Sequence, residues 1–147
     1  MPDTIHTTVA FHVPGPPEPW RRARSTGARR WTDPRSTAYR GHVLVQWRRT
    51  GSRTLPDGPV YLRVDAVFCR PRHHLTKDGA LTAAGRRATI PGSRMDVDNI
   101  AKAVMDALNG HAWRDDRQVV TLTARKMWAM PGRGEGVHVH AEPVEAA

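Results

Sequence analysis

Stretches with the composition of β-strands, several of them with alternating apolar and polar residues, occur at both ends and in the middle of this chain. They are residues 4–13, 60–69, 119–126 and 137–144, and a Pro-Gly turn at 131–134 separates the last two. The length of the stretch at 60–69 favours a central strand. The pattern therefore predicts a sheet built from segments that are far apart in the chain.

Apolar residues at spacings of three and four predict a first helix from Pro34 to about Thr50. Proline suits the first helical turn, and either Thr32 or Asp33 can cap it. The apolar residues of this helix share one face, which places them in the core rather than against nucleic-acid bases: Tyr39, Val43, Leu44 and Trp47.

The same spacing predicts a second helix that ends before Gly110, a residue suited to the left-handed position after a helix. Asp98 or Asn99 can cap its start. Its apolar face consists of Ile100, Ala103, Val104, Ala107 and Leu108.

Two segments between these elements carry most of the positive charge. Residues 14–36 are rich in proline and arginine, which predicts a stiff, DNA-binding segment, and residues 70–94 lose all periodicity, which predicts a long mobile basic loop. At 147 residues, the chain fits a single domain, 1–147.

The charge balance points to a polyanionic partner. Lys and Arg outnumber Asp and Glu by 23 to 14, which gives a net charge of +9. Nine of the arginines lie between residues 20 and 49, with Asp33 as the one acid, and the guanidinium fork suits phosphate recognition. A solvated surface is the alternative explanation, although so many like charges repel one another without a partner.

Other compartments and sites receive less support from the sequence. There is no apolar run near 18 residues to suggest membrane insertion. Residues 1–13 lack the pattern of a secretory signal, so we expect a cytoplasmic protein. The lone Cys69 lies in an apolar run and is expected to be a small buried side chain. His138 and His140 are interpreted as an exposed polar strand face rather than a zinc site.

Acidic residues bracket the second predicted helix. Asp96 and Asp98 are one residue apart, so an extended backbone directs both carboxylates to the same side. Asp116 follows the helix at the start of the next strand, and Lys102 lies one turn after Asp98. Converging carboxylates form the oxygen-rich site that Mg²⁺ or Mn²⁺ prefers. Each acid also has a simpler explanation, as a helix cap, an ion pair or part of a turn; Asp106 is interpreted as structural.

One stretch of this sequence closely resembles the RusA-type Holliday-junction resolvases. The shared motif is Asp-x-Asp-Asn, a lysine, an acid and Leu-Asn-Gly late in the helix, then Asp-Asp-x-Gln-Val. The chain matches it at Asp96, Asp98, Asn99, Lys102, Asp106, Leu108, Asn109, Gly110, Asp115, Asp116, Gln118 and Val119. A weaker resemblance covers the proline turn and basic run at 15–22.

The resemblance implies an α/β fold, a mixed sheet flanked by helices, in which residues 95–119 form the catalytic segment. It implies a homodimer that resolves four-way DNA junctions by paired nicks in recombination and repair, with Mg²⁺ as cofactor and Mn²⁺ as a substitute. Asp96, Asp98 and Asp116 would bind the metal, with Asp115 as a weaker candidate, and Lys102 would be the essential basic group. The DNA-binding residues would be Arg21, Arg22, Arg24, Arg29, Arg30 and Arg94.

Two other functions stay open at this point. The chain could be a metal-dependent nuclease that acts on other branched DNA or on RNA. It could also be a basic DNA-binding protein without catalytic activity, in which the acids are caps and ion pairs. Metal dependence of cutting separates the second of these from the nucleases.

Overall fold

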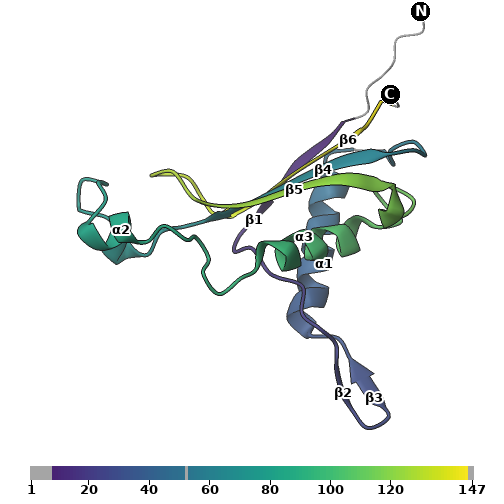
Figure 1. Cartoon of the computed structure of the whole chain (residues 1–147), viewed down its shortest axis with the longest axis horizontal. Helices are drawn as coiled ribbons and strands as arrows, with labels where there is room; N and C mark the ends of the chain where they lie inside the picture. Colours follow the sequence, from purple (N-terminus) through teal and green to yellow (C-terminus); the bar gives the residue numbers. More distant parts are fainter. Residues whose placement is uncertain (1–7, 52, 146–147) are drawn as a thin grey trace, which may run out of the picture.

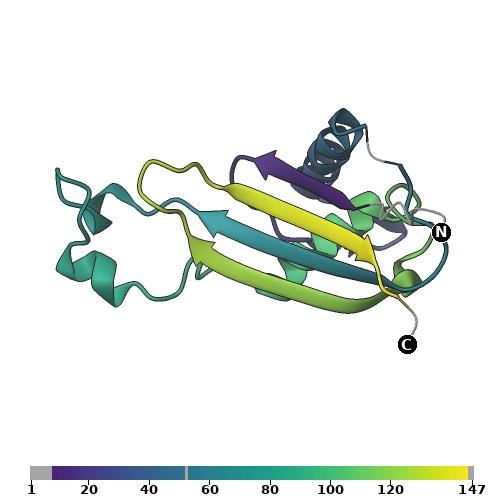
Figure 2. The same cartoon turned by 90° about the horizontal axis from the view of Figure 1, so that it is seen from above.

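A computed structural model describes residues 8–51 and 53–145 of the chain. It contains one four-stranded mixed sheet in the order β1-β6-β4-β5 (Figure 2). The strands are β1 (Val9–Pro14), β4 (Val60–Phe68), β5 (Val119–Trp128) and β6 (Gly136–Pro143). β6 is antiparallel to both of its neighbours, and β4 and β5 are parallel.

The strands confirm most of the pattern read from the sequence. β4 is central, and β5 and β6 fall on the two predicted closing stretches. The first strand was expected at residues 4–13; the structure has it from Val9, and residues 4–7 lie outside the described part. The parallel pairing of β4 with β5 requires a crossover connection, which brings α3 (Val97–Leu108) under the sheet.

Two helices, α1 (Pro34–Arg49) and α3, cover one face of the sheet (Figure 1). The fold is therefore α/β, as expected. The core lies between this face and the helices, where Trp113, Leu62, Ile100 and Leu108 are fully buried. Tyr39 and Trp47 of α1 also belong to this core, which confirms that neither is available for stacking on bases.

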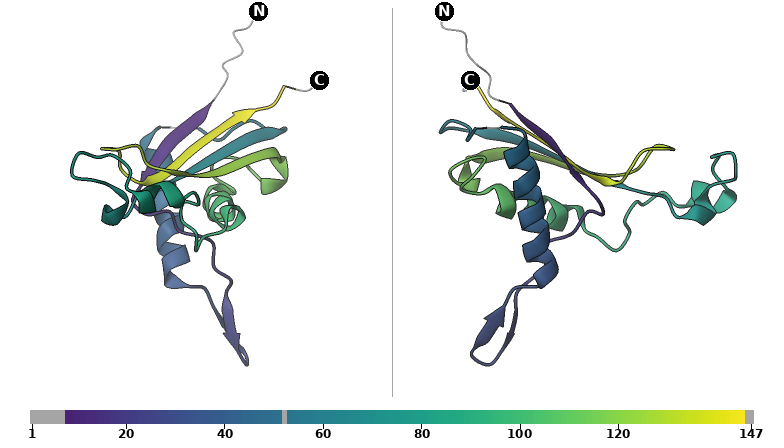
Figure 3. Two further views of the ribbon diagram at one scale, coloured as in Figure 1. Left: turned by 60° about the vertical axis from the view of Figure 1, so that its left-hand side comes forward. Right: turned by 180° about the vertical axis from the view of Figure 1, so that it is seen from behind.

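The start of α1 is the predicted one. The Asp33 side chain accepts a hydrogen bond from the Arg35 amide at 2.9 Å, and Pro34 occupies the first turn. Between the two cap candidates, Thr32 and Asp33, the structure selects the aspartate. Figure 3 shows α1 standing at a steep angle to the four-stranded sheet, so the first turn of α1 lies far from that sheet.

A short basic hairpin extends from this end of α1, and the sequence pattern did not predict it. It consists of β2 (Arg24–Thr26) and β3 (Arg29–Trp31), and all of its residues from 24 to 31 are exposed (Figures 1 and 3). Strands of three residues are too short to show an alternating pattern. Gly27 makes the turn possible, with a left-handed φ of 57°.

The basic segment 70–94 contains regular structure, contrary to the loop expected there. It forms η1 (Arg72–His74) and α2 (Ala83–Arg87), which lie beyond the end of the sheet (Figure 2). Thr82 caps α2 by accepting from the Gly85 amide at 3.1 Å. Gly85 also lies so close to the His74 carbonyl that a Cβ atom would collide with it. These local contacts do not depend on a periodic spacing of apolar residues, so the sequence pattern could not predict them.

The structure also differs from the sequence prediction at Cys69. It is exposed, not buried, because β4 ends at Phe68 and the chain leaves the sheet at this residue. The apolar run that precedes it belongs to the strand and predicts nothing about the residue beyond the strand.

The face of the sheet opposite the helices carries polar side chains. Asp65 of β4 binds the guanidinium groups of Arg63 and Arg125, at 2.8 Å in each case. Burial raises the pKa of Asp65, but the hydrogen bonds from Arg125 and Arg63 outweigh it and hold the pKa below its usual range. His138 is exposed on this face, as predicted. In the described ranges, no helix is long and apolar enough to cross a membrane.

Candidate active site

The acidic residues of interest lie at the beginning of α3 and in the turn that follows it. α3 begins at Val97, so Asp96 is its N-cap and Asp98 is already in the first helical turn. The expected extended Asp-x-Asp arrangement is therefore wrong, because only Asp96 has extended backbone angles. Both side chains are exposed.

The start of α3 is anchored to the edge strand of the sheet. Lys126 of β5 donates hydrogen bonds to the carbonyl oxygens of Met95 and Gly92, at 2.8 and 3.2 Å. Gly92 has a left-handed φ of 52°, and a Cβ atom there would collide with the Phe68 ring. These contacts hold the segment that presents Asp96.

One face of α3 carries Asp98, Lys102 and Asp106, which follow one another at intervals of four residues. The opposite face is buried in the core, and its five predicted apolar residues all belong to the core cluster. The helix therefore presents two carboxylates and one ammonium group along its open side.

Asp116 approaches this open side from the turn after the helix. It begins η2 (Asp116–Gln118), which leads directly into β5. Its carboxylate accepts a hydrogen bond of 2.7 Å from the indole N–H of Trp113, and its amide donates to the side-chain oxygen of Asn109 at 3.1 Å. Trp113 is fully buried, so the position of Asp116 is set by the core.

The environment of Asp116 disfavours its charge. Burial raises the pKa of its carboxyl group; the Trp113 hydrogen bond lowers it, and the nearby carboxylates of Asp106 and Asp115 raise it further. Lys102 is close enough to oppose this effect. The net pKa is raised, so a cation beside Asp116 would relieve an unfavourable charge.

Asp115 is occupied by local structure. Its carboxylate accepts from the Arg117 amide at 2.8 Å and pairs with the Arg117 guanidinium at 3.1 Å. Gln118 completes this turn: its side-chain oxygen accepts from the amides of Arg114 and Asp115, while its nitrogen donates to carbonyl groups at 56 and 58. Asp115 is thereby engaged within the turn, whereas Asp116 interacts electrostatically with Asp106 and Lys102 of α3.

Four acids around α3 differ from most other acids of the described ranges in forming no ion pair. Six acidic residues elsewhere form ion pairs: Glu18, Asp33, Asp57, Asp65, Asp115 and Glu142. Within the ranges the structure describes, no ion pair involves Asp96, Asp98, Asp106 or Asp116, although the chain has 23 Lys and Arg.

These carboxylates do not form a closed metal site. Across residues 8–51 and 53–145, no group of three or more acidic, histidine or cysteine side chains lies close enough to hold a metal ion. The donor type nonetheless fits a hard divalent cation, because carboxylates bind Mg²⁺ through one or two oxygens, with water and phosphate as further ligands.

Lys102 lies over an aromatic ring that the sequence did not associate with it. Its ammonium nitrogen is 4.5 Å from the centre of the Trp20 ring, within the range of a cation–π contact. The Trp20 amide donates to the Asn99 carbonyl at 2.8 Å, so the proline-rich segment is tied to α3 at this point. Trp20 thus restricts where Lys102 can reach.

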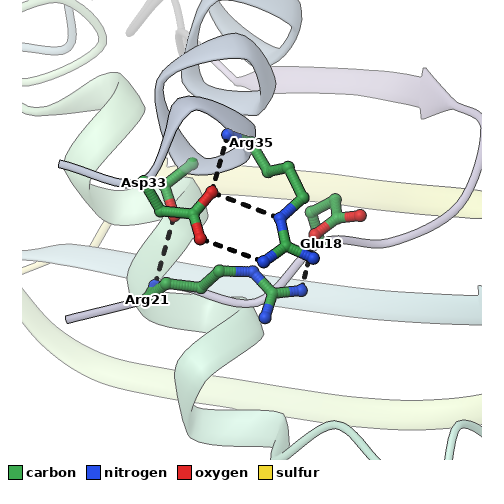
Figure 4. A network of polar contacts seen from close by, with 5 residues as sticks. Glu18, Arg21, Asp33 and Arg35 are labelled. Atoms are coloured by element: carbon green, nitrogen blue, oxygen red, sulfur yellow. Dashed lines mark hydrogen bonds and ion pairs between the residues drawn. The ribbon is translucent and has the colours of Figure 1, made fainter. Parts of the chain in front are cut away.

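The predicted DNA-binding arginines lie in two places. Arg22, Arg24, Arg29 and Arg30 are exposed on or before the hairpin, and Arg94 is exposed just ahead of α3. Arg21 is half-buried and binds Glu18 at 3.3 Å, next to the Asp33–Arg35 pair at 3.0 Å (Figure 4). Both groups are on elements that adjoin α3 or α1.

Comparison with known proteins identifies the family. The family model described as endodeoxyribonuclease RusA matches residues 14–139. The chain belongs to the RusA family. RusA membership indicates an endodeoxyribonuclease of the kind that acts on branched DNA, with a divalent metal as the usual cofactor of the family.

The matched region of this RusA-family chain contains α1, β4, α3 and β5 in full, together with the first half of β6. A relative from Bacillus subtilis (strain 168), "Uncharacterized protein YqaN", is 29% identical over 131 residues, which are 86% of this chain and 92% of the relative. The likeness to this relative therefore extends over nearly the whole of both proteins.

Several residues that build the site had no role assigned from sequence. Asn109 and Gln118 were part of the RusA motif, but their hydrogen bonds to the turn of Asp116 become visible only in the structure. The sequence did not indicate that Trp113 would bind Asp116 or that Trp20 would lie under Lys102. An aromatic side chain has many possible neighbours, and sequence spacing does not select among them.

Proposed function

We propose that this protein is a Mg²⁺-dependent endonuclease that resolves four-way DNA junctions by paired nicks, acting as a homodimer in recombination and repair. The observation that carries the proposal is the set of carboxylates at α3 that have no cationic partner in the described chain: Asp96, Asp98, Asp106 and Asp116. In a protein of net charge +9, acids without such partners favour an external cation.

Asp96, Asp98 and Asp116 would hold the metal, with Asp106 beside them and Asp115 kept in its turn by Arg117. When bound, Mg²⁺ supplies Lewis-acid polarisation of the phosphate and lowers the pKa of water. Mn²⁺ has the same preference for oxygen ligands and would substitute. Because these carboxylates do not converge closely enough to surround a metal ion by themselves, substrate phosphate and water would supply the remaining ligands.

The residues of the chain itself have separate tasks in this reaction. Lys102, held over Trp20, would provide its ammonium group to the negative charge that develops on the phosphate. Trp113 and Asn109 hold Asp116 in position through the two hydrogen bonds described above. The arginines at 21, 22, 24, 29, 30 and 94 would bind the phosphates of the DNA arms.

The test is cleavage of a four-way junction, a linear duplex, a flap and a single strand, each with and without Mg²⁺. We expect symmetric paired nicks in the junction, only with Mg²⁺ or Mn²⁺, and little cutting of the duplex. Metal-independent binding without cutting would support a DNA-binding protein. Equal cutting of all branched substrates, or of RNA, would support the broader nuclease function.

The contact of Trp20 with Lys102 gives a further prediction for this reaction. Replacing Trp20 by Leu removes the ring face, a contact of about 0.5–2 kcal/mol, and should lower the single-turnover cleavage rate by about twofold to thirtyfold. Trp20→Phe keeps a ring and should retain most of the rate. Rates are measured at saturating protein, so that changes in affinity do not contribute.

Trp31 offers a matched control, because it is an exposed tryptophan on β3, away from α3. Trp31→Leu should leave the rate at saturation unchanged. If Trp20→Phe loses as much rate as Trp20→Leu, the aromatic face does not position the lysine.

A further inference from the structure

A small pocket lies between the basic hairpin and the two helices. It has a volume of about 250 Å³ and is lined by Trp20, Arg21, Ala23, Arg30, Thr32, Ser36, Arg40 and Ala103. This is several times the roughly 30 Å³ that one water molecule occupies in the liquid. A group the size of a phosphate fits within it.

Three arginines from three different elements converge on this pocket. Arg21 comes from the segment after β1, Arg30 from β3 and Arg40 from α1. Residues alternate along a strand, so β3 directs Arg30 toward the pocket side and its neighbours Arg29 and Trp31 toward the other. The hairpin therefore contributes one arginine to the pocket and two side chains to its outer face.

The positive charge of the pocket is only partly compensated. Glu18 binds Arg21 at 3.3 Å, and Asp33 is engaged with Arg35 (Figure 4). Among the residues placed by the structure, Arg30 and Arg40 have no ion-pair partner. The Nε atom of Arg21 is buried, and no atom of the described residues accepts a hydrogen bond from it. A buried N–H of this kind is costly unless an acceptor arrives.

The pocket adjoins the candidate active site. Trp20 forms part of its wall and also lies under the Lys102 ammonium group, and Ala103 is the next residue of α3. A ligand in the pocket and a phosphate at Lys102 would thus occupy neighbouring positions along α3. Successive phosphates of one nucleic-acid strand are arranged in this way.

We propose that this arginine pocket binds one backbone phosphate of the nucleic acid, separate from the phosphate that reacts at the carboxylates of α3. That the bound phosphate belongs to a DNA strand rests on the proposed function. Arg21, Arg30 and Arg40 supply charged donors, and the Ser36 hydroxyl is held nearby by the Arg21 amide at 3.3 Å. The bound phosphate sets the register in which the strand passes Lys102 and Asp116.

The experiment measures binding of four-way junctions in EDTA by fluorescence anisotropy, with one neutral methylphosphonate at a different position in each junction. With the wild-type chain, we expect a loss of about tenfold at one position near the cleavage site, as for one charged contact. Arg40→Gln should weaken binding of the unmodified junction by a similar factor. In Arg40→Gln, the methylphosphonate at that position should cost nothing further.

Arg49→Gln is the matched control, because Arg49 is exposed on the same helix, about 13 Å along its axis from Arg40. This variant should keep the tenfold loss at the same phosphate. Arg30→Gln should behave as Arg40→Gln does, and thermal unfolding checks that each variant is folded.

Each outcome decides between the possibilities. An equal methylphosphonate loss in Arg40→Gln, Arg30→Gln and Arg49→Gln would overturn the pocket, and so would a wild-type chain without any sensitive position. Cleavage of the unmodified junction with Mg²⁺ is measured in parallel. Intact coupling without cleavage supports the pocket and overturns the nuclease function; no binding to any junction overturns both.

Discussion

Replacement of Asp116 by Asn should lower the single-turnover cleavage rate of a four-way junction by at least about a hundredfold. The physical reason is the loss of one anionic oxygen from the set of carboxylates beside α3. Asn keeps an oxygen that can accept the 2.7 Å hydrogen bond from the Trp113 indole, so the turn should retain its shape. The measurement is the cleavage rate at saturating protein and Mg²⁺.

Junction affinity in the absence of metal should persist in Asp116→Asn, because the variant carries one negative charge less than the wild type. The affinity is measured in EDTA. A folded Asp116→Asn protein that no longer binds the junction would contradict the assignment of Asp116 as a metal ligand.

Asp115→Asn is the control for this change, since it removes the same charge at the adjacent position. Asp115 pairs with the exposed Arg117, and an exposed pair is worth about 0–1 kcal/mol. We expect a small loss of stability and nearly normal cutting. If Asp115→Asn abolishes cleavage and Asp116→Asn does not, Asp115 is the metal ligand and Asp116 is not.

The second large effect is expected at Lys102. Lys102→Met keeps an unbranched chain as far as Cε but removes the ammonium group. It should lower the cleavage rate about 10²-fold to 10³-fold, as for loss of one donor to a developing negative charge. Binding should change much less, because one lost cation alters the salt dependence by a slope of about 0.9. The cleavage rate and the salt dependence of affinity are measured on the same protein preparation.

Lys77→Met provides the comparison for loss of a lysine, because Lys77 is exposed in the segment 70–94. It should cut at the wild-type rate. Normal cutting by Lys102→Met would show that the role implied for this lysine by the family is wrong in this chain.

Asp116 and Lys102 are held in position by different contacts. Asp116 depends on contacts with Trp113 and Asn109 and is half-buried, whereas Lys102 is exposed on α3 and depends on Trp20. Loss of cleavage in both variants, with binding retained, would locate the chemistry on the open side of α3. The arginine pocket would then describe how the strand is aligned with that side.

The regular elements of the core could be predicted from the sequence because their signals are local. α1 and α3 follow from apolar residues spaced by three and four, and the left-handed Gly110, with φ of 77°, ends α3 where expected. The central strand β4 follows from its apolar run. The acidic motif also predicts metal-dependent chemistry, since it places carboxylates at both ends of one helix, and this stays a prediction.

The sequence by itself determined the core elements, the charge and the composition of the site. Only the tertiary structure decided that Asp116 lies within electrostatic range of Lys102 and Asp106, that Trp20 lies under Lys102 and that three arginines share one pocket. A sequence period reports on neighbours within about four residues. The cation–π contact of Trp20 with Lys102 and the pocket shared by Arg30, Arg40 and Ala103 depend on how the helices and the hairpin pack. That packing is settled by the burial of the whole core.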